Sequence, residues 1–267
     1  MNKESRLQEA YLSRLEKQRR KIMAARILLA LAFFLLWETA ADNNWIDSFF
    51  FSSPSRLARL FLSMWRDGSL FLHVGITLTE TLVSFALVVV IGLAVSLLLW
   101  LSDSVFQVLE PYLVILNSLP KSALAPLLIV WLGANSRTII VAGMSVAIFG
   151  TILNLYTGFT ETSREKIRLI YTLHGTKKDA LTKVVLPSTV PMIISIMKVN
   201  IGLCLVGVVI GEFIGARNGL GYLIIYGSQV FQLDLVILSI LILCLMAMLL
   251  YGGVTAAEKL YHRRQHA

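Results

Sequence analysis

The sequence predicts an all-α integral membrane protein with six transmembrane helices and both termini in the cytosol. Of its 267 residues, 57% are hydrophobic and only 15% are charged, and the mean hydropathy is +0.75. Six segments reach the roughly 20 apolar residues that a helix needs to cross the hydrocarbon core of a bilayer. Such a composition argues against a soluble domain with a large core.

The predicted spans are separated by polar or turn-forming residues. The second and fourth contain no charged residue. Pro120, Lys121 and Pro126 interrupt the third, which is tolerated where neighbouring helices or water satisfy the freed carbonyl groups; a re-entrant pair of half-helices is the alternative there. The six spans are 22–41, 82–101, 113–132, 139–159, 190–214 and 235–254.

The distribution of basic residues predicts the orientation. Six spans place both termini on one side, together with the segment 160–189. Residues 1–21, 160–189 and 255–267 hold sixteen of the 24 Lys and Arg residues, whereas 42–81, 133–138 and 215–234 hold five. The positive-inside rule therefore predicts that both termini are cytosolic. The net charge of +8 is then explained without a nucleic-acid partner.

Segments outside the six-span region 22–254 have predicted roles as well. Residues 1–21 carry seven Lys and Arg residues, with Leu7, Tyr11 and Leu15 four residues apart. This pattern predicts a basic amphipathic helix that contacts anionic membrane lipid. A secretory signal is the competing interpretation, but no small-residue cleavage site follows the apolar stretch. Residues 255–267 form a basic tail.

The loop 42–81 contains an amphipathic run of its own. The sequence Ser53-Pro54-Ser55 precedes apolar residues at helical spacing, and Asp67-Gly68 ends the run. This predicts a short helix at the membrane interface. A plain surface loop is the alternative.

The polar stretch 161–191, between the fourth and fifth spans, is predicted to be a cytosolic docking element. Six basic and three acidic residues accompany an apolar ridge, which a solvated linker would not need. Two short helices joined at His174-Gly175 would fit, because glycine tolerates a sharp turn and Leu186-Pro187 stops the second helix. The ridge consists of Ile167, Ile170, Tyr171 and Leu173.

The sequence lacks the usual motifs of catalytic and metal chemistry. No G-x-x-x-x-G-K-[ST] phosphate loop occurs, so we expect ATP hydrolysis, where it is needed, in a separate chain. The histidines are scattered, without an H-E-x-x-H or a Cys/His grouping. Cys204 and Cys244 lie in apolar segments and are interpreted as packing residues. We therefore expect neither enzymatic activity nor a cofactor or metal.

Two charged residues, Lys198 and Glu212, lie within the fifth predicted span. They stand about 21 Å apart along a helix and cannot pair with each other. Ionisable groups in a membrane are costly, so a translocation route is the functional interpretation. The structural alternative is that Lys198 reaches the headgroups and Glu212 reaches water. Gly207, Gly211 and Gly215 would let another helix pack closely against this span.

Several stretches, in order from Ser53 to Leu223, resemble binding-protein-dependent ABC importer permeases. LHGTKKDALTKVVLPSTVP resembles the cytosolic EAA loop of that family, and the whole chain resembles its nitrate, sulfonate, taurine and bicarbonate branch. SSPSRL, LNSLPKSALAPLLIVWLGA and VVIGEFIGARNGLGYLI support this, as does Lys198 where the family usually has Arg. Leu169-Ile170 depart from the family's alanines. His174 stands where the family has glycine, unless that glycine has shifted to Gly175.

The resemblance implies the fold of type I ABC importer permeases and a set of partners. Two permease copies, as a homodimer, would bind two ABC ATPase subunits, and an extracytoplasmic solute-binding protein would deliver the cargo. The implied ATPase-docking residues are Ile170, Tyr171, Leu173, His174, Gly175, Thr176, Asp179, Leu186 and Pro187. The implied translocation path or gate includes Pro120, Lys121, Pro126, Trp131, Lys198, Glu212, Gly219 and Gly221.

Nitrate, sulfonates, taurine or bicarbonate are the implied cargo, and a thiamine-precursor pyrimidine or another vitamin-like solute is the alternative. Two other protein classes compete with this interpretation. A membrane-embedded enzyme would need clustered His, Asp or Glu residues at membrane depth. A self-sufficient secondary transporter often has broken helices in matching halves, and the broken third span has no evident counterpart.

Overall fold

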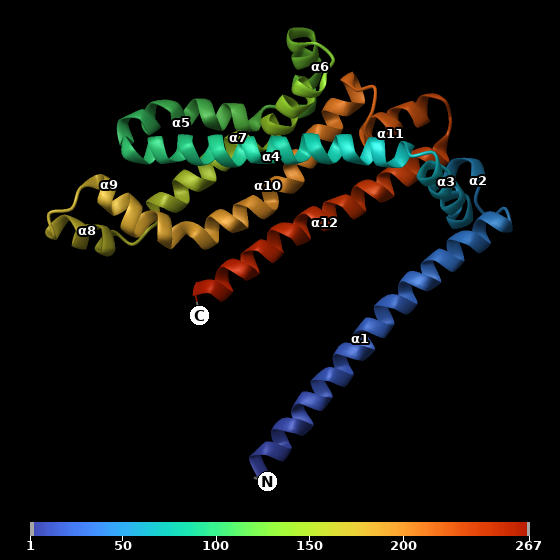
Figure 1. The fold of residues 1–267 in the computed structure, drawn as a ribbon, viewed down its shortest axis with the longest axis horizontal. Helices are drawn as coiled ribbons and strands as arrows, with labels where there is room; N and C mark the ends of the chain where they lie inside the picture. Colours follow the sequence, from blue (N-terminus) through green and yellow to red (C-terminus); the bar gives the residue numbers. More distant parts are fainter. Residues whose placement is uncertain (1–2, 266–267) are drawn as a thin grey trace. The chain divides into compact units, whose positions relative to one another are not determined.

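The computed structural model describes residues 3–265, with side-chain surroundings for residues 17–259. Within these residues every regular element is a helix (Figure 1). Five helices are long and apolar enough to cross a membrane, and one bent pair could supply a sixth span. The predicted all-α fold class, with five or six candidate spans, is therefore confirmed. The chain divides into two compact units, Met1–Ser63 and Met64–Ala267.

In the first unit, helix α1 (Lys3–Asp42) is continuous through residue 21. The basic segment and the first predicted span are thus one helix. Apolar side chains along its span are exposed, including Leu28 at 71% and Leu29 at 74%, as expected of a helix that faces lipid. The side chains of Leu7, Tyr11 and Leu15 lie outside the described residues, so contact of the basic segment with lipid stays a prediction.

A helix is present where the short interfacial helix was predicted, as α3 (Pro54–Arg66), which follows the short α2 (Ser48–Phe51). Its position at the membrane interface stays a prediction. Its run ends one residue before the predicted Asp67-Gly68, so the plain-loop alternative is wrong. Leu57 and Met64 are buried, whereas Trp65 is 52% exposed, as in an amphipathic helix. The Ser55 amide donates to Glu38 Oε2 at 2.9 Å, which ties the start of α3 to α1.

The second unit is built on α4 (Ser69–Leu101), α7 (Ser136–Thr160) and α10 (Leu186–Gly215), with α7 packed against both of the others. α4 begins 13 residues before the predicted span at 82. Small residues permit close approach: a Cβ added at Gly207 would lie 2.8 Å from the Gly143 Cα on α7. The predicted close packing around Gly207 is confirmed.

The third predicted span, 113–132, is not one helix. Residues 103–132 form α5 (Asp103–Ser118) and α6 (Lys121–Leu132), which are bent by 95°. The break follows from Pro120, which lacks an N–H and disfavours helical backbone at the residue before it; Leu119 is extended, with φ −62° and ψ 139°. Because α6 is only about 18 Å long, the structure supports a pair of half-helices here, either as a broken span or as the re-entrant loop that was the alternative.

Two short helices follow α7, namely α8 (Arg164–Thr172) and α9 (Lys177–Ala180). The second does not stop at Leu186-Pro187, so this prediction is wrong. A π-helical turn, η1 (Leu181–Val185), joins α9 directly to α10, and the Leu186 amide bonds to the Leu181 carbonyl. The wider turn accommodates the proline ring and its missing N–H.

The two remaining helices are α11 (Leu220–Gln229) and α12 (Leu233–Gln265). α12 packs on both α10 and α11. The continuous helical run Lys177–Gly215 is 39 residues long, or about 58 Å. This exceeds the roughly 30 Å hydrocarbon core, so the α9 end of the run extends beyond the membrane.

Candidate functional site

The turn after α8 closes with two characteristic hydrogen bonds. The Gly175 amide donates to the Ile170 carbonyl at 2.9 Å, and the His174 amide donates to the Tyr171 carbonyl at 3.0 Å. His174 has φ +60°. This is a Schellman motif, in which the left-handed residue is usually glycine. A histidine there costs about 1 kcal/mol in backbone strain.

The residue with the left-handed backbone conformation in this turn is therefore His174. The sequence had suggested Gly175, because glycine tolerates a sharp turn. Gly175 serves another purpose: a Cβ added there would lie 2.5 Å from Ile170 Cγ2 and 2.9 Å from the Ile170 carbonyl oxygen. The two adjacent residues thus make different contributions to the turn. His174 adopts the left-handed conformation, and Gly175 permits close approach to α8.

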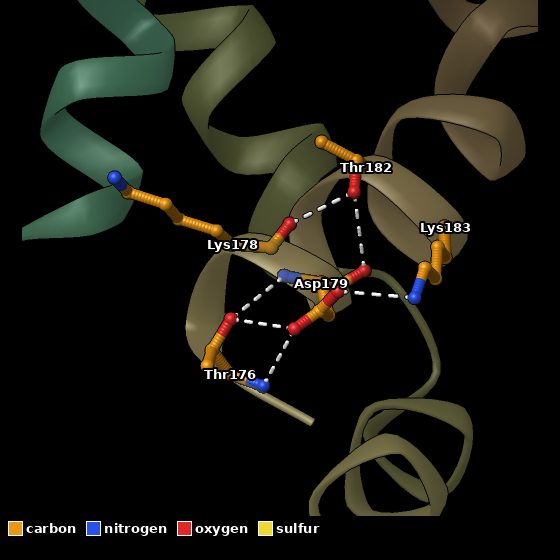
Figure 2. Close-up of polar contacts among 5 residues, drawn as sticks. All are labelled: Thr176, Lys178, Asp179, Thr182 and Lys183. Carbon is orange, nitrogen blue, oxygen red and sulfur yellow. Dashed lines mark hydrogen bonds and ion pairs between the residues drawn. The ribbon is translucent and has the colours of Figure 1, made fainter.

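A capping box fixes the start of α9 (Figure 2). The Thr176 amide and hydroxyl donate to Asp179 Oδ2 at 2.9 and 2.6 Å, and the Asp179 amide donates back to Thr176 Oγ1 at 3.3 Å. The Thr176 hydroxyl and amide, helped by Lys183 at 3.0 Å, hold the pKa of the Asp179 carboxyl well below its usual range. Sequence TKKD, with its first and fourth residues matching the capping pattern, encodes this local structure.

The predicted apolar ridge divides into an inner and an outer part. Ile167 and Ile170 pack against the unit's own core. Tyr171 and Leu173 are 46% and 70% exposed. Leu169, which the docking prediction omitted, is 59% exposed. We call Leu169, Tyr171 and Leu173 the exposed apolar trio. Ile170 is therefore half-buried against the chain's own core, and its predicted contact with an ATPase stays a prediction.

Beneath the trio, α9 and η1 are anchored to the spans. Ala180, Leu181 and Val185 are buried in a core cluster together with residues of α4 and α7; the cluster consists of Trp100, Leu155, Phe159, Ala180, Leu181 and Val185. Lys177 Nζ lies 3.7 Å from Asp103 Oδ1 and 5.4 Å from the centroid of the Trp100 ring. The segment between α7 and α10 is thus packed directly onto the ends of the spanning helices.

Of the predicted path residues, Lys198 forms an ion pair with Glu258 of α12. The sequence argument missed Glu258, because it lies beyond the sixth predicted span. Lys121 Nζ donates to the Leu116 and Asn117 carbonyls at 2.8 and 2.5 Å, where a positive charge suits the C-terminal end of α5. Both cations are therefore engaged by nearby groups.

The break at the end of α5 contains Pro120, which precedes α6, whereas Pro126 lies inside α6 and Trp131 is 69% exposed near its end. Leu186 and Pro187 begin α10, behind the π-helical turn. The predicted gate residues Pro126 and Trp131 thus lie on one short helix. Leu186, a predicted docking residue, packs against the core cluster.

Glu212, only 1% exposed, belongs to a buried network that holds the start of α11. Three successive amides, from Gly219 to Gly221, donate to His73 Nδ1 at 3.0 Å, Thr77 Oγ1 at 2.8 Å and Glu212 Oε2 at 2.6 Å. Thr77 also donates to Glu212 Oε1 at 2.7 Å. These bonds satisfy the N-terminal amides of α11. The structure therefore favours a structural role for Glu212, Gly219 and Gly221.

A polar pocket of about 340 Å³ lies between α5, α7 and α10. Its five polar side chains were not singled out in the sequence, although Asn and Ser in apolar spans are a usable signal. We call it the amide pocket. Its polar lining consists of Asn117, Thr151, Asn154, Ser195 and Asn200.

The sequence is similar to several transport permeases. It is 29% identical to a probable ABC transporter permease protein of Haemophilus influenzae over 89% of this chain and 95% of that protein. It is 27% identical to the formylaminopyrimidine transport permease ThiX of Halalkalibacterium halodurans, over 87% and 92%. It is 24% identical to the taurine transport permease TauC of Escherichia coli, over 84% and 83%.

The fold is similar to one seen in inward-facing structures of the MetNI methionine ABC transporter. The match has a TM-score of 0.60 and 20% identity, and it covers 69% of this chain and 92% of that one. Residues 88–265 match the family described as the inner membrane component of binding-protein-dependent transport systems. This region includes the segment between α7 and α10 and the amide pocket. The chain belongs to this family of ABC importer permeases.

Proposed function

We propose that this permease subunit moves a small solute across the membrane between two copies of itself, with energy from ABC ATPase subunits that hold the segment between α7 and α10. Family membership implies both an ATPase and a binding protein as partners. The exposed apolar trio carries the proposal about docking, because three large apolar side chains at the end of a charged segment form a natural contact surface. The permease itself needs no catalytic residue.

Movement of the docking segment would reach the spans through packed side chains. α9 and η1 share a core cluster with α4 and α7, and Lys177 contacts groups on α4 and α5. Packed cores move as units rather than deforming continuously. A partner that pulled on α8 and α9 would therefore displace the spanning helices, as alternating access requires.

The amide pocket supports a location for the path. Asn117, Asn154 and Ser195 are exposed although they lie in apolar helices. Polar side chains within the hydrocarbon core raise the free energy of the protein when they contact lipid. They are tolerated when they contact water or another protein. The face formed by α5, α7 and α10 would therefore line a wet path or meet the second permease copy.

The cargo proposed from similarity is a small polar solute. Taurine and formylaminopyrimidine are named for two of the relatives, so both a small sulfonate and a vitamin precursor are candidates. The binding protein would deliver this solute on the side opposite the docking segment, with both termini of the permease in the cytosol.

Transport by the purified complex tests the proposal. Proteoliposomes containing the permease, its ATPase and the binding protein should accumulate labelled solute only with ATP. Omission of the ATPase, or substitution of its catalytic residues, should abolish uptake. Uptake that needs no ATPase and follows an ion gradient would instead identify a secondary transporter, and would overturn the proposal.

A further inference from the structure

We propose that the amide pocket holds the solute in transit and is built for an uncharged polar solute, such as a small heterocycle with several hydrogen-bonding groups. This inference rests on the proposed transport function and extends it to the chemistry of the cargo. It implies that the solute contacts the side chains of the pocket, and not the charged residues Lys198 and Glu212, as it crosses the membrane.

The amide pocket has unused hydrogen-bonding capacity. Within the described residues, the side chains of Asn117, Asn154 and Ser195 make no hydrogen bond, although all three line the pocket. Asn200 Nδ2 donates to Thr151 Oγ1 at 2.8 Å, which fixes the floor of the pocket. Amide and hydroxyl groups can both donate and accept, so they suit a partner with mixed donors and acceptors.

The amide pocket lies near the middle of the spanning helices α7 and α10. Asn200 is the 15th of the 30 residues of α10, and Thr151 lies past the middle of the 25-residue α7. Polar side chains in the middle of spanning helices generally face a protein interior or a water-filled cavity. A hydrophilic solute crossing the membrane at this level would exchange bonds to water for bonds to these side chains.

The lining of the amide pocket suits an uncharged solute. No charged side chain lines the pocket. The cations on adjoining segments are engaged, because Lys121 Nζ bonds to carbonyl groups and Lys198 pairs with Glu258. An anion such as nitrate would leave its water shell without a cation to replace it, which is strongly unfavourable. An uncharged solute would lose only hydrogen bonds, which the amides can replace.

The size of the amide pocket suits a small ring compound. A volume of about 340 Å³ lies within the range typical of small-molecule sites. Such a site exceeds the needs of a three- or four-atom anion and accommodates a substituted ring. Among the cargo classes named for the relatives, formylaminopyrimidine matches this description better than taurine.

Occupancy of the pocket can be measured directly by cysteine protection. In the complete complex with exposed Cys244 replaced by alanine, Ser195→Cys should react with a maleimide. Millimolar formylaminopyrimidine should slow this reaction at least several-fold, whereas nitrate and taurine should not. Ser228→Cys, on an exposed part of α11 outside the pocket, is the matched control and should not be protected.

Protection by nitrate or taurine that equals or exceeds protection by formylaminopyrimidine would overturn the inference, as would the absence of protection by all three. These outcomes do not depend on ATP, so they are distinct from failure of ATP-driven uptake, which would count against the proposed function.

Transport by a second pair of variants tests the same point. Asn154→Leu, which removes the amide at nearly constant volume, should lower formylaminopyrimidine uptake about tenfold, as expected for one lost hydrogen bond. Asn43→Leu makes the same replacement outside the pocket and should transport like wild type. Unchanged uptake by Asn154→Leu, with the complex assembled as in wild type, would contradict a role for the pocket in solute contact.

Discussion

At the residue scale, Asp179 shows how a short sequence pattern positions the docking segment. Its carboxylate accepts two hydrogen bonds from Thr176 and pairs with Lys183. Asp179→Ala should therefore loosen the start of α9 and speed hydrogen exchange of the amides from 176 to 180, as measured by mass spectrometry. Lys178→Ala is the control, because Lys178 contributes its backbone carbonyl to the bond with Thr182.

The lowered pKa of Asp179 sets the pH range of this effect. A carboxyl group with a lowered pKa in the folded state contributes its full stability above the ordinary Asp pKa of about 3.9. That contribution is lost only as the pH falls through the lower, folded-state value. The difference between Asp179→Ala and wild type should thus be the same at pH 6 and pH 8. A difference that vanished at pH 6 would contradict the capping role.

Glu212 is the residue whose interpretation changed most. Because Glu212 accepts from Thr77 and Gly221, Glu212→Leu would leave buried donors unsatisfied, at a cost of about 1 to 3 kcal/mol each. We expect a lower midpoint of thermal unfolding and a reduced yield of assembled complex. Glu212→Gln keeps one acceptor and should be milder. Normal stability of Glu212→Leu together with defective transport would restore the path interpretation.

At the element scale, α8 has one side that belongs to the core and one set of side chains left for a partner. Ile170→Asp would place a charge against the core cluster and should lower stability by about 1 to 3 kcal/mol. Leu173→Asp alters a residue that is 70% exposed and should change stability by less than about 0.5 kcal/mol. It should nevertheless reduce ATP-driven uptake about tenfold by weakening a central contact.

The two variants of α8 are distinguished by measuring thermal stability and uptake together. Wild-type transport by a stable Leu173→Asp complex would show that the exposed apolar trio does not contact the ATPase. Loss of stability in Leu173→Asp would contradict the assignment of Leu173 to the exposed side of α8.

Some elements could be predicted from the sequence because their signals are local. The helix α3 and the two helices α8 and α9 follow from amphipathic spacing and turn residues. The π-helical turn before Pro187 could not be predicted in this way. In the sequence, a proline predicts the end of a helix. Here the residues before and after Pro187 both pack against the core, and the wider π-helical turn accommodates the proline ring without ending the helix.

At the scale of the whole molecule, the asymmetry of basic residues predicts that the docking segment and both termini are cytosolic. With Cys244 replaced by alanine, Lys178→Cys should react with a membrane-impermeant maleimide in inside-out vesicles. Arg217→Cys should react in right-side-out vesicles. Both residues are exposed. The reverse labelling pattern would contradict the predicted orientation.

The fold class followed from composition and span length, which depend little on tertiary contacts. The site was harder to predict, because it depends on which side chains meet. Lys198 meets Glu258 across 60 residues of sequence, and Glu212 meets Thr77 across 135. A sequence pattern that covers a few neighbouring residues cannot predict such long-range pairs. The amide pocket likewise forms only when α5, α7 and α10 come together.

The account depends most on the claim that an ATPase holds the segment between α7 and α10. Photo-crosslinking from position 173 tests this directly, with a photoreactive amino acid replacing Leu173 in the complete complex. We expect a crosslink to the ATPase from position 173 and none from position 217, which lies in the loop after α10. A crosslink to the ATPase from position 217, or none from position 173 in a complex that transports solute, would contradict the account.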